Sequence, residues 1–289
     1  MFKTPEWFFL ERGQGRPLLL LHGLGACSFS WRANLEPLSA HYRVLAPDLP
    51  PHGRTGLTPG ADYRLEALAD GVLAFMDSRD VDQAAVAGNS LGGSLALLLA
   101  RHHPERVAAL ILLAPAAALT RVPLIFRPLR LPGLGLLAAA LLGPWMLPLA
   151  LRLMYHRREL VTPEVVAGYA PTFETMARRL ALRRLARQLE LWPLSKVELL
   201  LEEIKQPVTI IWGKEDRILP VRQADFLKRH LPQADLYVLP QVGHAPQEEA
   251  PDAVNEIIIA FLARTLKNQR QEIYSKQEGD GELSGPDKG

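Results

Sequence analysis

A single serine stands in a pattern that could make it a nucleophile. The segment Gly88–Gly92 reads Gly-Asn-Ser-Leu-Gly, which is the G-x-S-x-G spacing, and it joins an apolar stretch to a helical one. A serine on so tight a strand-to-helix turn needs neighbours with almost no side chain two positions away on either side. The turn would lift the Ser90 hydroxyl clear of the backbone. It would also aim the Leu91 N–H, at the start of the helix, toward an oxyanion formed there.

An acid and a base follow in the C-terminal third of the chain. Asp216 comes after the expected strand 208–212, and His244 comes after the expected strand 235–239. A serine hydroxyl is a poor nucleophile at neutral pH, so a base must take its proton. Imidazole can do so and can return the proton to a leaving group, while a carboxylate holds the imidazole in the right tautomer. The chain order Ser90, Asp216, His244 therefore predicts a catalytic triad.

A second glycine-flanked turn, His22–Gly25, follows the apolar stretch 18–21. Backbone of this kind can present another N–H to an oxyanion, and we expect it to be that of Leu24. The predicted oxyanion hole is thus formed by the N–H groups of Leu24 and Leu91, with Gly23 beside the substrate. His22 is expected to hold the loop in shape.

These residues need a scaffold that brings them to one edge. The sequence alternates strand-like and helical patterns, which favours an α/β fold with a mostly parallel central sheet and helices on both faces. In such a sheet, residues at the carboxyl ends of the strands share one edge, where ligands bind. The expected strands are 8–11, 18–21, 43–46, 84–87, 107–113, 208–212 and 235–239, and the expected helices are 29–39, 63–78, 91–103, 221–230 and 253–266.

The alternation stops between residues 113 and 208, an interval too long for a structureless loop in such a domain. We expect an inserted helical cap there. The predicted division is a core formed by 1–118 and 204–266, a cap over 119–203, and a polar tail over 267–289 that is expected to be disordered. Within the cap, Thr162 followed by proline and glutamate predicts the start of a helix.

Composition excludes several classes of function. The chain has 289 residues, 33 Lys and Arg against 31 Asp and Glu, and a formal net charge of +2, so nothing in the charge balance favours a nucleic-acid partner. One cysteine excludes a disulfide scaffold and a zinc site built from several thiolates. The N-terminus shows no secretory pattern. These features favour a cytoplasmic location.

The cap differs from the rest of the chain in its charge. Segment 121–190 contains eleven Arg and four Glu, without Lys or Asp, and 131–151 is a run of 21 uncharged residues. That run could span a bilayer by length, but its prolines and glycines predict two or three short helices. A helix pair lying on a membrane surface is favoured over a span, since arginines flank the run. Peripheral contact with lipid through the cap therefore remains open, beside the simpler interpretation of solvated arginines.

The motifs resemble those of the α/β-hydrolase superfamily, in the branch with a helical cap, over about residues 5–265. The resemblance depends on Leu21–Gly25, Ala46–Pro50 with the following His-Gly pair, Gly88–Gly93, Trp212–Asp216 and Gly243–His244. It implies the triad named above, with Asp216 rather than its neighbour Glu215 as the acid. One departure is Pro51, where relatives usually carry glycine.

The expected activity is hydrolysis of carboxylic esters of hydrophobic substrates through an acyl-serine, as in carboxylesterases and lipase-like enzymes. The elbow also resembles that of carbon–carbon bond hydrolases acting on ring-fission products of aromatic compounds. Those enzymes commonly have a tryptophan after the catalytic histidine, where this chain has Ala245. A third alternative is a member that binds a ligand or assists a pathway without hydrolysis.

The cap supplies the clue to the substrate. Phe126, Trp145 and Met154 are expected to roof the serine together with leucines, and Ala245 is expected to contact the substrate. An apolar pocket of this kind favours an acyl chain or another hydrophobic group. No sequence motif implies a cofactor or a metal ion. The oligomeric state is left open.

Overall fold

The computed structural model describes residues 6–118 and 127–281. Its centre is a seven-stranded sheet with the order β1-β3-β2-β4-β5-β6-β7. Only β1 runs antiparallel to its neighbour, and the other strand pairs are parallel. The strands are β1 Phe9–Arg12, β2 Pro17–Leu21, β3 Arg43–Pro47, β4 Ala84–Asn89, β5 Val107–Leu113, β6 Val208–Gly213 and β7 Asp235–Leu239. The predicted α/β architecture with a mostly parallel sheet is confirmed.

Helices cover both faces of the sheet, which explains why its central strands are largely apolar. On β2, Leu18 and Leu20 face one hydrophobic cluster, and Leu19 and Leu21 face the other. Successive side chains of a strand point to opposite faces, so a strand buried on both faces cannot alternate with polar residues. The run of four leucines is therefore the sequence of a central strand.

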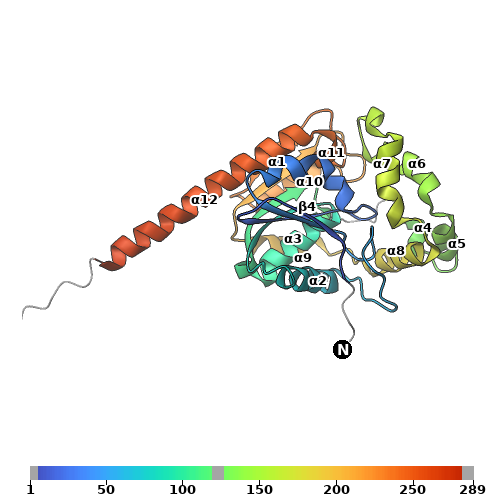
Figure 1. Ribbon diagram of the computed structural model, residues 1–289, viewed down its shortest axis with the longest axis horizontal. Coiled ribbons are helices and arrows are strands. Elements are labelled where there is room, and N and C mark those ends of the chain that lie inside the picture. Colours follow the sequence, from blue (N-terminus) through green and yellow to red (C-terminus); the bar gives the residue numbers. More distant parts are fainter. Residues whose placement is uncertain (1–5, 119–126, 282–289) are drawn as a thin grey trace, which may run out of the picture.

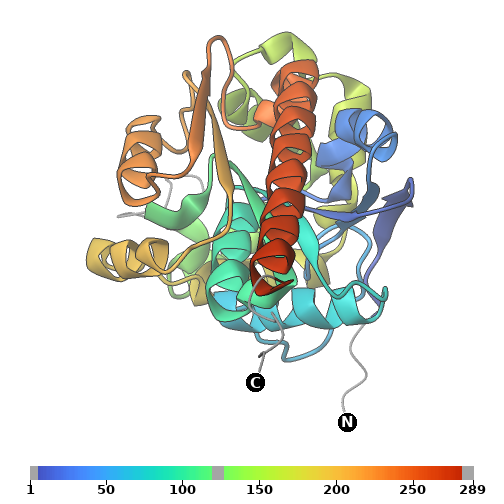
Figure 2. The same ribbon diagram turned by 90° about the vertical axis from the view of Figure 1, so that its left-hand side faces the viewer.

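One face is covered by α1 (Arg32–Ser39) and α12 (Pro251–Gly281); α12 crosses the view in Figure 2, and the shorter α1 lies next to its upper part. The opposite face carries α2 (Leu65–Asp77), α3 (Leu91–His102), α9 (Leu194–Glu202) and α10 (Arg222–His230). A short helix, α11 (Pro246–Glu249), follows β7. The helices thus form the outer layers of a three-layer core.

The cap lies at one edge of this core, to the right in Figure 1. Its helices are α4 Arg127–Arg130, α5 Leu134–Leu141, α6 Leu147–Met154, α7 Pro163–Tyr169 and α8 Met176–Gln188. Short 3-10 helices occur at Ser28–Trp31, Pro104–Arg106, Ala116–Ala118, Pro144–Met146, Arg158–Leu160 and Ala170–Thr172. The uncharged run is thus broken into short helices, as its prolines and glycines predict. Thr162 caps α7, its hydroxyl accepting the Val165 N–H at 3.4 Å.

Two parts of the predicted division differ from the structure. Helix α9 falls inside the predicted cap, yet Val197, Leu200 and Leu201 pack into the core cluster beside α3 and α10. The apolar side of α9 packs on the nearest core surface that no other helix covers. The position of α9 in the sequence does not reveal where that surface lies.

The last helix also extends beyond its predicted end at residue 266. α12 continues to Gly281 and projects away from the body of the molecule (Figure 1), so 267–281 is helical where the polar composition predicts an irregular tail. Residues 267–281 contain no proline and many Lys, Gln, Glu and Arg. These are good helix formers, and a helix already begun on the sheet can extend through them without further packing. The final residues, 282–289, lie outside the described part of the chain.

Candidate active site

Ser90 occupies a tight turn between β4 and α3. Its backbone has φ 52° and ψ −113°, in the region that residues with side chains rarely adopt. The turn is held by the Ser90 N–H, which donates to the Leu113 carbonyl oxygen at 3.0 Å, and by the Ser90 carbonyl oxygen, which accepts the Ala116 N–H at 3.0 Å. A strained, well-anchored serine is the feature expected of a nucleophile on an elbow.

The glycines around Ser90 are required by contact with the backbone. A Cβ atom at Gly92 would lie 2.2 Å from the carbonyl oxygen of Leu21, and one at Gly88 would lie 2.3 Å from the backbone of Gly92. Both distances are far inside van der Waals contact, so only glycine lets α3 come this close to β2 and β4. The spacing of the motif is therefore explained by sterics.

The loop after β2 lies directly against the elbow. A Cβ atom at Gly23 would be 3.2 Å from Cβ of Ser90, so Gly23 leaves open the space beside the serine. Within the described part of the chain, the N–H groups of Leu24 and Leu91 donate no hydrogen bond. Both remain available as donors, as an oxyanion hole requires.

His22 fixes this loop rather than taking part in proton transfer. Its Nδ1 lies 2.8 Å from the Gly23 carbonyl oxygen, and its Nε2 accepts the Leu49 N–H at 2.8 Å, so both ring nitrogens are engaged. Complete burial lowers the pKa of His22 to about 4. The neighbouring His52 ring packs edge-on against it, and burial lowers the pKa of His52 to about 3. Both imidazoles are neutral structural groups.

The acid and base come together at the carboxyl ends of β6 and β7. His244 Nδ1 lies 2.7 Å from Asp216 Oδ2, and the other carboxylate oxygen of Asp216 accepts the N–H groups of Ile218 and Leu219, each at 2.8 Å. Both side chains are buried. With one oxygen held by two backbone donors and the other on the ring, the carboxylate fixes the imidazole in one orientation. Glu215 turns elsewhere, its carboxylate accepting the Val242 N–H.

The His244 backbone is attached to the elbow and to the cap. Its carbonyl oxygen accepts the side-chain N–H of Asn89, which also donates to the Leu113 carbonyl oxygen, both at 3.1 Å. Its N–H donates to the Met154 carbonyl oxygen at 2.9 Å. Ser90 and His244 therefore lie on directly connected segments, although no hydrogen bond joins their side chains in the described chain. Catalytic hydrogen bonds are often completed only when substrate is bound.

Two consecutive carboxylates tie the histidine loop to the cap, and sequence reasoning assigned them no role. Glu249 is buried and accepts the Gly243 N–H at 2.9 Å, the His156 N–H at 2.7 Å and the Arg157 N–H at 3.0 Å. Burial raises its pKa, and these backbone donors oppose that rise. Glu249 thus joins the loop before His244 to the segment that follows α6.

Glu248 connects the same loop to more distant parts of the cap. It accepts the Tyr155 hydroxyl at 2.7 Å and the Tyr169 hydroxyl at 2.5 Å, and it forms a salt bridge with Arg32 of α1. Burial raises the pKa of Glu248, while Arg32 lowers it. The only signal in the sequence was an acidic pair four and five residues after His244, and the structure places this pair at the end of α11.

The predicted cap residues do not all reach the site. Met154 and Ala245 pack in one cluster with Ala26, Tyr169 and Phe173, next to the histidine loop. Trp145 does not, because its side chain is 72% exposed on the outside of the cap, and its prediction as part of the roof is wrong. Short helices broken by proline can turn either face outward, so composition alone could not orient it. Phe126 lies outside the described residues.

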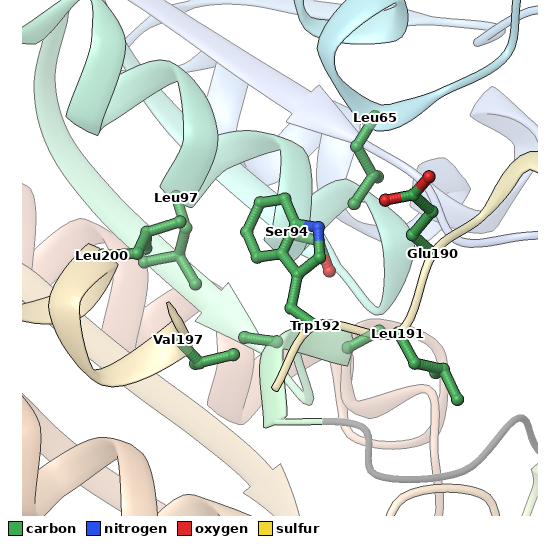
Figure 3. A pocket seen from close by; sticks show the side chains of 10 residues that line it. Leu65, Ser94, Leu97, Glu190, Leu191, Trp192, Val197 and Leu200 are labelled. Carbon is green, nitrogen blue, oxygen red and sulfur yellow. The ribbon is translucent and has the colours of Figure 1, made fainter. Parts of the chain in front are cut away.

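A small apolar cavity lies along α3, one helical turn beyond Ser90 (Figure 3). Ser94 and Leu97 of α3 line it together with Trp192 and α9. Its volume of about 40 Å³ is far below the roughly 300–1,000 Å³ of ligand pockets. Leu65 of α2 and the segments 116–117 and 190–192 complete its lining. Among the side chains that the structure describes, no three of His, Cys, Asp or Glu are grouped as a metal site would require.

Comparison with known proteins identifies the family of this chain. Residues 16–251 match the model of the alpha/beta hydrolase fold family. The chain is 31% identical to a 2-hydroxy-6-oxo-6-phenylhexa-2,4-dienoate hydrolase from Burkholderia cepacia, over 88% of this chain and 90% of the relative. It is 30% identical to a 2-hydroxy-6-oxononadienedioate/2-hydroxy-6-oxononatrienedioate hydrolase from Comamonas testosteroni, over 88% and 90%. A thermophilic esterase from Thermogutta terrifontis shares the fold, with a TM-score of 0.76, 24% identity, and coverage of 90% and 94%.

Proposed function

Because this chain belongs to the α/β-hydrolase family, related to meta-cleavage product hydrolases, we propose that it is a serine hydrolase that cleaves carboxylic esters of hydrophobic substrates. The observation that carries the proposal is the His244–Asp216 pair, which is held on the segment next to the strained Ser90 elbow. Membership of the family supports hydrolase activity in general, and specificity for esters is what we propose in addition.

The reaction begins when His244 Nε2 takes the proton of the Ser90 hydroxyl as its oxygen attacks the ester carbonyl carbon. The Nδ1–H of the resulting imidazolium donates to Asp216, whose charge stabilises it. As the tetrahedral intermediate collapses, the bond to the alcohol oxygen breaks and His244 returns the proton to that oxygen. Water, deprotonated by the same imidazole, then attacks the carbonyl carbon of the acyl-serine. The bond from that carbon to Ser90 Oγ breaks, His244 returns the proton to Ser90 Oγ, and the acid is released.

The oxyanion of the intermediate would be held by the N–H groups of Leu24 and Leu91. Leu91 is the first residue of α3, so its N–H lies at the positive end of the helix dipole. Donors already fixed by the fold stabilise developing charge without reorganisation.

The surroundings of the histidine loop support an apolar substrate. The cap cluster beside it contains Ala26, Met154, Phe173 and Ala245. Contacts of this kind favour an acyl chain or another hydrophobic group.

A second candidate is hydrolysis of a carbon–carbon bond in a ring-fission product. The names of the Burkholderia and Comamonas relatives favour it. Against it stands the position after the histidine, where the family's carbon–carbon hydrolases are expected to have tryptophan. Ala245 is fully buried there, in a space that the cap cluster fills.

Turnover of p-nitrophenyl esters of increasing acyl length, and of a 2-hydroxy-6-oxodienoate, separates the two candidates. We expect ester turnover that falls by at least about 10³-fold in Ser90→Ala. The control is Ser39→Ala, at the end of α1, whose hydroxyl donates only to the Glu36 carbonyl oxygen among the described residues, and which is expected to stay near wild type. Ester turnover that survives in Ser90→Ala would contradict the mechanism, and efficient cleavage of the dienoate alone would favour the second candidate. A folded protein inactive on both would favour a ligand-binding member instead.

A further inference from the structure

The outer side of the cap exposes large apolar side chains on two consecutive helices. On α5, the 3-10 helix Pro144–Met146 and the start of α6, six of them are more than half exposed: Leu134, Leu136, Leu137, Leu141, Trp145 and Leu149. We call these six residues the cap leucine face. α5 and α6 lie together at the edge of the molecule farthest from the free end of α12 (Figure 1). Exposed apolar groups gathered in this way mark interaction or membrane sites.

The same helices also have a packed inner side, so the cap leucine face is a second apolar surface. Gly135 and Ala139 of α5 are buried toward α4 and α8, and Leu147 and Leu151 of α6 are buried toward α7. A Cβ atom at Gly135 would lie 2.7 Å from the Leu129 carbonyl oxygen, which shows how closely α5 is seated. A helix that is apolar on all sides is stable only when something covers its outer side as well.

The charges around the face suit an anionic partner. From Arg127 to Arg158 the sequence has five arginines and no acidic residue. Arg152 and Arg158 are exposed, and neither forms a salt bridge within the described residues. Arg152 lies on α6 one turn after Leu149. An apolar surface with an exposed arginine on one of its helices and a tryptophan among the leucines matches a membrane interface, where acyl chains lie beneath charged headgroups.

The lengths and the angle of α5 and α6 favour a position on the surface of a bilayer over a span across it. No described helix is by itself both long and apolar enough to span; only α5 and the segment 144–154 taken together reach that composition, and they are bent by 80°. A helix of eight residues is about 12 Å long, against a hydrocarbon core of about 30 Å. Two short helices at a steep angle can still place their outer side chains among the headgroups.

We propose that the cap leucine face docks on the surface of a membrane that contains anionic lipid. Docking would bring the lipid phase close to the site, since the last residue of α6, Met154, accepts the His244 N–H. An apolar substrate dissolved in the membrane would then reach Ser90 beside the docked helices. This goes beyond the proposed function, because the docking itself requires no catalysis.

The test is co-sedimentation of the full chain with phosphatidylcholine vesicles, with and without phosphatidylglycerol. The variant is Leu137→Gln/Leu149→Gln, which removes one exposed leucine from each helix. The matched control is Leu199→Gln, since Leu199 is 60% exposed on α9, away from the cap leucine face. Turnover of a short soluble ester is measured on every protein, so that loss of docking is distinguished from loss of the proposed activity.

We expect wild type and Leu199→Gln to bind vesicles containing phosphatidylglycerol, more weakly at high salt. Binding by the double variant is expected to fall about tenfold or more, because two apolar side chains no longer leave water. The proposal is overturned if wild type binds no vesicle, or if the double variant binds as well as wild type. It is also overturned if the wild-type protein is a dimer that the double variant converts to monomer, which would assign the face to a second copy.

Discussion

Leucines of the sheet and leucines of the cap have opposite environments in this protein. Leu18 to Leu21 on β2 are at most 1% exposed, whereas Leu134 and Leu137 on α5 are 64% and 57% exposed. The two segments are similarly apolar in sequence. What differs is the number of layers around them, since β2 has helices on both sides and α5 packs on α4 and α8 with its inner side.

The sheet and the outer cap therefore obey different constraints. In the core, apolar residues are needed for stability and hold the proposed catalytic residues at the sheet edge. In the outer cap, exposed residues of the same type are expected to contribute little to folding. Five changes test this difference, from the largest expected effect to the smallest.

Asp216→Asn should have the largest effect, on turnover rather than folding. An amide in place of the carboxylate no longer stabilises the imidazolium, and it favours the wrong tautomer of His244. We expect kcat to fall by about 10³–10⁴-fold with the thermal transition little changed. Steady-state ester kinetics measures it, and Glu215→Gln serves as the control. A comparable loss in Glu215→Gln would mean that the acid is wrongly assigned.

Leu20→Ala should destabilise the core strongly. Leu20 is fully buried between β2 and the helices α1 and α12, so truncation removes apolar contact and leaves a cavity. A loss of about 2–5 kcal/mol in the free energy of unfolding is expected. Urea titration followed by circular dichroism measures it. A change below 1 kcal/mol would show that the sheet can collapse around the gap.

His22 should make the stability of the core depend on pH. Its folded pKa of about 4 lies below the ordinary value of 6.5, so the unfolded chain takes up a proton first. The stabilisation from keeping His22 neutral is present above pH 6.5 and is lost as the pH falls toward 4. The stability penalty of His22→Asn should therefore shrink by about 2 kcal/mol between about pH 7.5 and about pH 5. An equal penalty at both pH values would contradict the neutral imidazole.

Glu249→Gln should weaken the connection between core and cap. Three backbone N–H groups reach the two carboxylate oxygens, and an amide can offer only one oxygen to them. We expect a loss of about 1–3 kcal/mol and faster proteolysis near residue 157. The control is Glu159→Gln, whose side chain is 67% exposed and paired with Arg157. Similar behaviour of the two variants would show that Glu249 does not anchor the cap.

Leu137→Ala should have the smallest effect on stability. Its side chain already contacts water, so truncation is expected to change the free energy of unfolding by less than about 0.5 kcal/mol. The same urea titration measures it beside Leu20→Ala. A loss of stability as large as that of Leu20→Ala would show that exposed cap leucines and buried sheet leucines contribute equally to folding.

Much of the fold was predictable because it depends on local patterns. Strands β5 and β7 begin and end at the predicted residues, 107–113 and 235–239. The turn at Ser90 also follows from its sequence, since the glycines two positions away are those that backbone contact requires. Burial on both faces and tight turns each leave a clear mark on a few consecutive residues.

The positions of other residues depended on contacts across the chain. Trp145 resembles a pocket residue by composition but faces water, and Glu249 resembles a surface acid but is buried among backbone donors. α9 packs into the core because an uncovered apolar surface lies next to α3. None of these contacts has a fixed separation in sequence.

The sequence by itself determined the sheet, the elbow and the acid and base that follow in order. Only the tertiary structure decided how Asp216 is held, which carboxylates fasten the cap to the histidine loop, and which face of α5 and α6 is left open. The reason is that a turn or a buried strand is specified by its own residues. The partner of a buried carboxylate, and the covered side of a short apolar helix, are specified by whatever the rest of the chain brings beside them.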